Sequence, residues 1–346
     1  MMTYAPGLKG AESLVATDFY LCGELETIVN KHKWIDQPLR SGHKIFIISG
    51  RCGRLANRMV LFANFIAWAE EQGDRVMNPT FHSYAHLFET TRRDIYCQYP
   101  APARQSWMDV FPGVSAVIRG TRLFFRVARA AGGLNEKLPV FGKGVVTLRQ
   151  TPGKDITALD GPEVQVKIRD ARIILVNGWN FRVPHLVQRH AEKLKLYFQP
   201  IAELEQASRQ AVNGLRQEAN VLVGVHIRRG DYSNWRGGQC FFEISRYASW
   251  MRELDEQLRP RKVSFLVCSD EPREKNEFSG LSVEFGAGTP VGDLYALAKC
   301  DYIFGPLSTF SQWASFYGGK PLLHLSDKNA RVELARFSVS DLREVP

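Results

Sequence analysis

Two arginines, a histidine and an aspartate fall within six residues of the chain, in the run His226-Ile227-Arg228-Arg229-Gly230-Asp231-Tyr232. A guanidinium group is a planar, bidentate fork that stays charged at any working pH. It therefore suits a diphosphate whose negative charge grows as a leaving group departs. The run indicates a polyanion-binding site, and the alternative is a solvated charge cluster at an ordinary strand end.

The preceding residues, 221–227, are almost all apolar, which predicts a strand buried in a parallel sheet. Ligands bind beyond the carboxyl ends of such strands, so the run is expected at that edge. Strands and helices of regular length are predicted to alternate after it, as in a parallel sheet with crossover helices. The predicted strands are 221–227, 263–268, 302–304 and 321–325, and the predicted helices are 242–258, 291–299 and 310–317.

A second candidate is the turn Gly50-Arg51-Cys52-Gly53, between a predicted strand at 44–49 and a predicted helix at 59–69. Backbone N–H groups at the start of a helix can hold a phosphate. The turn is neither G-x-G-x-x-G nor a P-loop, so a dinucleotide site or a P-loop is poorly supported. A turn with two glycines can also be purely structural.

The chain has 346 residues, which favours two domains because one core rarely exceeds about 250–300 residues. Pro200 lies between the two strand-rich parts, and a strand at 173–179 and helices at 184–198 and 200–217 are expected around it. The predicted parts are an N-terminal extension (1–43), a first domain (44–200) and a second domain (201–346).

The charge is +9, with 45 basic and 36 acidic residues, which favours an anionic partner. The six cysteines contain no C-x-x-C pair, so we expect reduced thiols in a cytosol. No apolar run reaches about 18 residues, and the N-terminus lacks signal-peptide features. Asp270-Glu271 is the only acidic pair at a predicted strand end and Asp-x-Asp is missing, so no metal site is predicted.

Three motifs in order, Gly53–Met59, His226–Tyr232 and Thr289–Leu297 leading to Ser308–Ala314, resemble the α-1,2-fucosyltransferases, glycosyltransferase family 11. That family lies within the wider α-1,2, α-1,6 and protein O-fucosyltransferase group. The resemblance implies a GT-B-like α/β fold, in which two Rossmann-like lobes with parallel sheets face each other across a cleft. It also implies inverting transfer of L-fucose from GDP-β-L-fucose to a sugar hydroxyl, with no metal or cofactor.

By this resemblance Arg228 binds the diphosphate and is catalytic. His226 and Asp293 match positions that contact guanine, and Arg54 and Asn57 match a turn that faces the donor, with Asn57 also catalytic. Three further residues fall where hydroxyl and backbone N–H groups at a helix start would hold phosphate. These are Ser308, Thr309 and Phe310.

Two residues depart from the family's usual turn, Gly-Arg-Leu-Gly-Asn-Gln-Met. Ala56 carries a methyl group where a close backbone approach is expected. Arg58 could direct its charge toward phosphate or acceptor, or point to solvent. An inverting transfer also needs a base near the acceptor hydroxyl. The candidates are Asp231, which could instead be paired with the arginines, and Glu243.

Other functions stay open at this stage: an α-1,6-type or other GDP-sugar transferase, or an inactive module that binds a GDP-sugar or a glycan. A nucleic-acid partner is disfavoured because the basic residues are mostly dispersed. The expected acceptor is an oligosaccharide or a lipid-linked glycan. A predicted basic helix near 116–131 could lie on an anionic membrane, and the alternative is a surface helix whose apolar side packs on the protein core. We expect a cytoplasmic protein with peripheral contact at the cytosolic face of the membrane. The arginines of this helix are Arg119, Arg122, Arg126 and Arg129.

Overall fold

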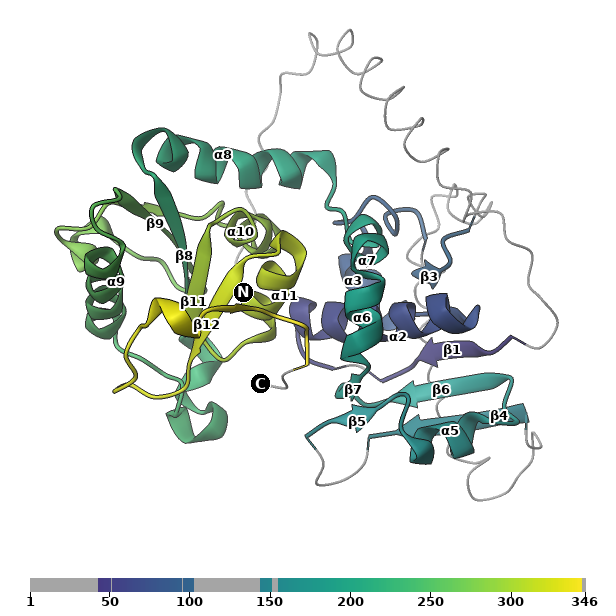
Figure 1. Cartoon of the computed structure of the whole chain (residues 1–346). Helices are drawn as coiled ribbons and strands as arrows, with labels where there is room; N and C mark the ends of the chain where they lie inside the picture. The colour runs from purple at the N-terminus through teal and green to yellow at the C-terminus, as the bar shows by residue number, and fades with distance from the viewer. Residues whose placement is uncertain (1–42, 51, 95, 103–143, 151–154, 344–346) are drawn as a thin grey trace, which may run out of the picture. The chain divides into compact units, whose positions relative to one another are not determined.

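The computed structural model describes residues 43–50, 52–94, 96–102, 144–150 and 155–343 (Figure 1). Two main sheets, each largely parallel, are built from strands on either side of residue 200. The expected α/β class with parallel sheets is therefore confirmed, while the domain bounds themselves stay predictions. The predicted helix at 116–131 lies outside the described residues.

The first sheet has the strand order β3-β2-β1-β6-β4, and all its pairs are parallel except β2 with β3. Its central strand β1 reads Ile-Phe-Ile-Ile and is largely buried, as expected for a strand covered on both faces. The strands are β1 (Ile45–Ile48), β2 (Arg75–Met77), β3 (Gln98–Tyr99), β4 (Val145–Arg149) and β6 (Ile173–Asn177). A separate small ladder joins β5 (Thr157–Ala158) to β7 (Phe181–Arg182).

The helix α2 (Leu55–Gln72) follows β1 and is buried along most of its length, because apolar residues occur all round it. It ends at Gly73, whose φ of 73° is the left-handed conformation that favours glycine. The predicted helix at 184–198 is divided at His190 into two shorter helices. The other helices of this part are η1 (Pro79–Phe81), α3 (His82–Ala85), α5 (Pro162–Ile168), α6 (Pro184–Arg189) and α7 (Ala191–Tyr197).

The second sheet has the strand order β10-β9-β8-β11-β12-β13, and only β13 is antiparallel to its neighbour. The chain moves outward from β8 through β9 to β10, and then returns to the other side of β8 with β11. The strands are β8 (Val221–Ile227), β9 (Val263–Ser269), β10 (Val283–Phe285), β11 (Tyr302–Pro306), β12 (Pro321–Leu325) and β13 (Ser338–Val339). The strand order therefore reverses between β8 and β11, the kind of point where open α/β sheets bind ligands.

The predicted alternation after residue 220 is confirmed, although the short strands β10 and β13 were not predicted. The longer helices of this part are α8 (Ala202–Glu218), α9 (Ile244–Leu258), α10 (Pro290–Leu297) and α11 (Thr309–Gly318). Four 3-10 turns complete it: η4 (Gly230–Ser233), η5 (Trp235–Gly238), η6 (Lys275–Phe278) and η7 (Leu334–Arg336).

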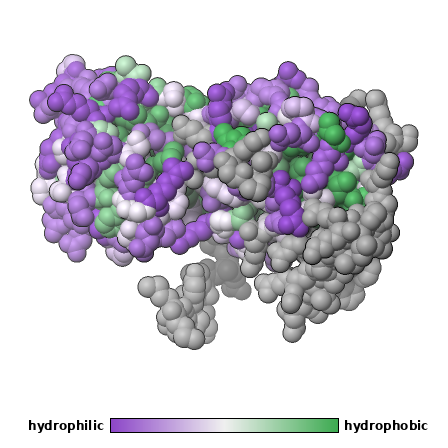
Figure 2. Space-filling model, turned by 90° about the horizontal axis from the view of Figure 1, so that it is seen from below, coloured by the Kyte–Doolittle hydropathy of each residue, from purple (hydrophilic) through white to green (hydrophobic). Residues whose placement is uncertain are grey.

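The face of the molecule in Figure 2 is mostly hydrophilic, with apolar residues scattered among polar ones. Scattered apolar residues are normal on the surface of a folded protein. Within the described ranges, no helix combines the length and the apolar character needed to cross a membrane.

Candidate functional site

Strand β8 ends at the carboxyl edge of the second sheet, so the run His226–Tyr232 lies at that edge. All seven of its residues are buried, and it lies between β9 and β11 at the point where the strand order reverses. The close approach of β11 is possible because Gly305 has no side chain: a Cβ there would meet the carbonyl oxygen of His226 at 2.4 Å. The residues that follow β8, β9 and β11 therefore converge on one edge.

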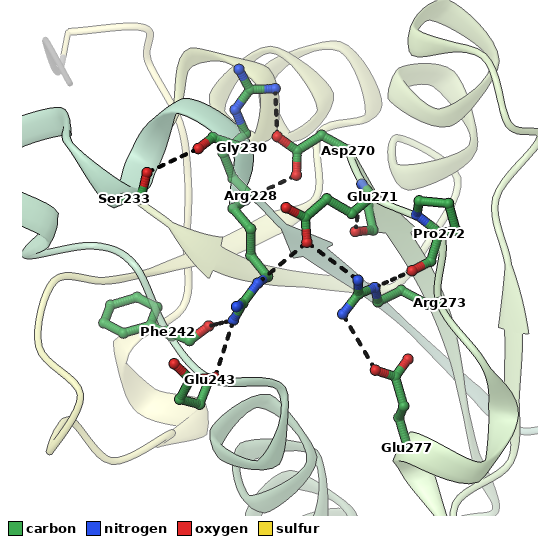
Figure 3. A network of polar contacts seen from close by, with 12 residues as sticks. Arg228, Gly230, Ser233, Phe242, Glu243, Asp270, Glu271, Pro272, Arg273 and Glu277 are labelled. Carbon is green, nitrogen blue, oxygen red and sulfur yellow. Dashed lines mark hydrogen bonds and ion pairs between the residues drawn. The ribbon is translucent and has the colours of Figure 1, made fainter.

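Arg228 is held at this edge by two carboxylates, and Figure 3 shows one of them, Asp270. Its Nη2 donates to Oδ1 of Asp231 at 2.5 Å, and its Nη1 lies 3.2 Å from Oδ2 of Asp270. Its guanidinium carbon is 5.7 Å from the centre of the Tyr232 ring. The side chain is 17% exposed, so it is oriented by the protein and still reachable by an anion. This arrangement suits the tight, preorganised binding of a phosphate.

Arg229 has a different environment, although it is the next residue. Its Nη1 donates to the carbonyl oxygen of Phe242 at 2.8 Å, and its guanidinium lies 4.2 Å from the centre of the Phe241 ring. Glu243 and Glu271 lie 3.4 Å and 3.3 Å from its nitrogen atoms. Arg229 is thus engaged in a network of protein groups (Figure 3), and of the two arginines only Arg228 lies between Asp231 and Asp270.

His226, near the end of β8, and Phe310, in the first turn of α11, form a stacked pair. Their ring centres are 4.9 Å apart with an interplanar angle of 28°. Burial, with a smaller effect of the Arg228 charge, lowers the pKa of His226 to about 3, so the ring is neutral at pH 7. Its Nδ1 is buried and has no hydrogen-bond partner among the described residues. A buried polar atom without a partner is uncommon and indicates a place where a ligand could bind.

The start of α11 contributes hydroxyl groups to the same edge. Ser308 caps the helix by accepting a hydrogen bond from the Phe310 backbone N–H at 3.2 Å. Thr309 donates its hydroxyl proton to Oδ1 of Asn57. The positive end of a helix favours negative charge, so this end of α11 supports anion binding beside Arg228.

Asp293 lies in the first turn of α10, close to His226. His226 and Cys268 are paired neighbours on β8 and β9, and the Cys268 thiol contacts the carbonyl oxygen of Asp293. Oδ1 of Asp293 accepts the Gly288 backbone N–H at 3.0 Å. Burial raises the pKa of Asp293 to about 6, although backbone N–H groups act in the opposite direction. A buried carboxylate with so few donors is suited to a ligand that brings N–H donors.

The glycine turn before α2 brings Arg54 and Asn57 to this edge of the second sheet. Arg54 is exposed, and its Nη2 lies 3.8 Å from Oδ2 of Asp231. Asn57 accepts the hydrogen bond from Thr309 already described. Gly53 has a φ of 49°, and a Cβ there would meet the Asn57 side chain at 2.0 Å. The turn therefore depends on glycine at position 53.

Neither direction expected for Arg58 from the sequence is correct. The residue is buried, and its guanidinium donates to backbone carbonyl groups and to Ser83 rather than facing phosphate, acceptor or solvent. Ala56 is also buried, with 6% of its surface exposed. Its methyl group belongs to the protein interior.

The sequence identified neither Asp270 as a site residue nor Arg182 as a buried arginine. Asp270 accepts the Arg229 backbone N–H at 2.9 Å and pairs with Arg228, so this carboxylate orients an arginine. The available signal in the sequence was that Asp270 directly follows β9, the strand that pairs with β8. Arg182 is 1% exposed, and its Nε and Nη2 have no partner in the described part of the chain. Nothing in its sequence context distinguished it from a surface arginine.

Across the described ranges, no group of three or more His, Cys, Asp or Glu residues could hold a metal ion.

Residues 170–336 match the family model for Glycosyl transferase family 11. Over this segment, just under half of its length, the chain is similar to that family. The chain is 24% identical over 202 residues to galactoside 2-alpha-L-fucosyltransferase SEC1 of Bos taurus, an alignment covering 52% of each protein. It is 29% identical over 132 residues to galactoside alpha-(1,2)-fucosyltransferase 2 of Sus scrofa, covering 34% of this chain and 36% of the relative. The chain thus spans about half or less of the length of these curated relatives.

A solved structure of Arabidopsis thaliana FUT1, an arginine-to-lysine mutant in complex with GDP, is similar in fold to this chain. The similarity covers 90% of this chain and 77% of the plant chain, with a TM-score of 0.54 and 14% sequence identity. The expected GT-B-like fold class is therefore confirmed.

Proposed function

We propose that this chain belongs to glycosyl transferase family 11 and transfers L-fucose from GDP-β-L-fucose to a hydroxyl group of a glycan, forming an α-1,2 linkage. The names of the curated relatives support both the sugar and the linkage. The observation that carries the proposal is the geometry of Arg228. Its guanidinium lies where the strand order reverses, between two carboxylates and beside the start of α11.

Each group at the edge has a proposed part in holding the donor. Arg228, with the hydroxyl and backbone N–H groups around Thr309, binds the diphosphate. His226 and Asp293 contact the guanine base, where the free Nδ1 and the buried carboxylate match the polar edge of a purine. Asn57, fixed by Thr309, lies between the diphosphate and the transferred sugar.

In the proposed reaction the acceptor hydroxyl oxygen attacks C1 of fucose on the face opposite to GDP. The C1–O bond to the β-phosphate breaks, the electron pair leaves with GDP, and the configuration is inverted. Arg228 neutralises the charge that develops on the diphosphate, a role that a divalent ion could otherwise take, so we propose that no metal or cofactor is required.

The acceptor proton needs a base, and we propose Asp231. Its two carboxylate oxygens face Arg228 and Arg54, and the side chain is half exposed, so an acceptor can reach it. Glu243 is the alternative base; it is more exposed and lies in the Arg229 network. A cytoplasmic location and a lipid-linked acceptor at an anionic membrane also stay proposals.

A screen of nucleotide sugars tests the function. We expect GDP release in the presence of acceptor glycans to be fastest from GDP-fucose, with GDP-mannose and UDP-galactose near background. Linkage analysis and the anomeric configuration of the product should give an α-1,2-fucoside. An α-1,6 product would correct the linkage, faster turnover of another sugar would correct the donor, and binding of GDP-fucose without turnover would indicate a binding module.

A further inference from the structure

Arg58 is a charged residue of helix α2, and its burial is unusual for a charged side chain. It is 9% exposed, and no described carboxylate is paired with it in an ion pair. Its guanidinium group lies over the Tyr84 ring, 5.2 Å from the ring centre. A buried charge is costly unless its hydrogen-bonding groups are satisfied, so its partners indicate why it is there.

The partners of Arg58 join two segments of the chain. Nε donates to the carbonyl oxygen of Cys52 at 3.2 Å, and Nη2 donates to that of Gly53 at 3.3 Å. Nη1 donates to the carbonyl oxygen of Thr80 at 2.7 Å and to Oγ of Ser83 at 3.2 Å. Arg58 therefore fastens the glycine turn to the segment from η1 to α3.

The glycine turn that Arg58 holds leads into the first turn of α2, and these two segments carry the residues that meet the second sheet. Asn57 is adjacent to Arg58 in sequence, accepts the Thr309 hydroxyl and packs directly against Gly53. Arg54 follows Gly53 and approaches Asp231. A displacement of the Gly53 carbonyl would therefore move both residues relative to the edge where the donor is proposed to bind.

We infer that Arg58 is a positioning residue for the transfer reaction: it fixes the glycine turn so that Asn57 meets Thr309 and the transferred sugar. Arg58 does not touch the donor, because its guanidinium is buried and three of its nitrogen atoms already donate to protein oxygens. The inference rests on the proposed function for its kinetic consequence, although the fastening of the turn can be measured without any reaction.

Arg58→Lys is the test, because an ammonium group keeps the charge but cannot reach three separated carbonyl groups with a planar fork. We expect kcat for GDP-fucose to fall about 10- to 100-fold, as small misplacements near reacting groups do. The Kd for GDP, measured by calorimetry, should change by less than about threefold, since the second sheet supplies the groups proposed to bind the nucleotide. A purely structural role would lower the melting temperature without separating kcat from GDP affinity.

Arg246→Lys is the matched control. Arg246 also donates to two backbone carbonyl groups, those of Lys328 and Ala330, and lies 4.7 Å from the centre of the Trp250 ring. It belongs to α9, and none of its side-chain contacts is with a proposed site residue. Its replacement should leave kcat unchanged at a temperature where the variant is folded.

A double-mutant cycle then asks whether Arg58 acts through Asn57. In the Asn57→Ala background, Arg58→Lys should reduce kcat/KM by less than about threefold further, because coupled residues are not additive. Amide hydrogen exchange in residues 52–57 should be faster in Arg58→Lys than in wild type. Additive effects in the cycle, or unchanged exchange in the turn, would overturn the inference. A wild-type protein without turnover would instead overturn the proposed function, and the exchange measurement would still decide whether Arg58 holds the turn.

Discussion

The carboxyl edge of the second sheet and the glycine turn of the first sheet hold their candidate residues in different ways. At the edge, Arg228 is oriented by two carboxylates, and His226 by a stacked ring. At the first sheet, the Asn57 side chain packs against the backbone of the glycine turn at Gly53. The buried Arg58 donates a hydrogen bond to the Gly53 carbonyl oxygen. Substitutions at the edge should therefore change charge and nucleotide binding, whereas substitutions at the turn should change geometry.

The two arginines at the centre of these regions illustrate the difference. Arg228 pairs with carboxylates and is 17% exposed, so it can give part of its charge to an incoming anion. Arg58 donates to neutral carbonyl oxygens and is closed off from solvent. In our proposals the same type of side chain therefore binds an anion in one region and fixes the backbone in the other.

The largest expected effect tests the edge. Arg228→Ala and Arg228→Lys should each reduce kcat for GDP-fucose by about 10²–10³-fold, because lysine keeps a charge but loses the bidentate fork. Steady-state kinetics measure this, and circular dichroism checks the fold. Retention of a tenth of wild-type turnover by Arg228→Ala would show that this guanidinium is not the main stabiliser of the leaving group.

Asp231→Asn is the companion variant, since it leaves the Arg228 fork in place and removes the proposed base. Transfer should fall strongly while GDP affinity changes little. Full transfer activity in this variant would exclude Asp231 and turn attention to Glu243.

A smaller effect is expected when Asp293 is replaced. This variant tests whether the carboxyl edge of the second sheet binds the nucleotide. Asp293→Asn should raise the Kd and KM for GDP-fucose about tenfold with little change in kcat, because a carboxylate that accepts base N–H groups acts equally in ground and transition states. Donor binding favours the ionised form, so wild-type affinity should increase as the pH rises through about 6, the raised pKa of Asp293. Calorimetry from pH 5 to pH 7.5 measures this.

Titration of the nucleotide phosphate affects measurements on wild type and on Asp293→Asn equally, so the variant is a control for it. Only the difference between their pH profiles reports on Asp293. The raised pKa has a consequence for folding too: the stability that this group contributes is present below its ordinary pKa of 3.8 and is lost as the pH rises through about 6. That loss should be missing in Asp293→Asn. Identical pH profiles for the two proteins would contradict the assignment.

Much of the second sheet could be predicted from the sequence, because its strands are short apolar runs with helices of regular length between them. The position of Arg228 followed from the apolar residues 221–227 and the rule that ligands bind at strand ends. The first sheet was harder to predict. Its strands β2, β3 and β4 are short, and their pairing depends on contacts that are distant in sequence.

Partnerships between side chains could not be predicted in the same way. Arg228 and Arg229 are adjacent, and only the three-dimensional arrangement of Asp270, Glu243 and Glu271 separates their environments. The direction of Arg58 was predicted wrongly because its partners, Thr80 and Ser83, lie on another segment. Sequence patterns place a residue on an element, but long-range contacts decide what its side chain does.

The most direct test of the account is the rate of GDP release and fucosyl transfer from GDP-fucose by the wild-type protein in excess EDTA. We predict the same transfer rate as in untreated buffer, because in our proposal the Arg228 guanidinium neutralises the diphosphate in place of a divalent ion. A mild increase on adding Mg²⁺, from faster release of GDP, agrees with this prediction. Complete loss of transfer in EDTA that Mg²⁺ or Mn²⁺ restores would contradict it.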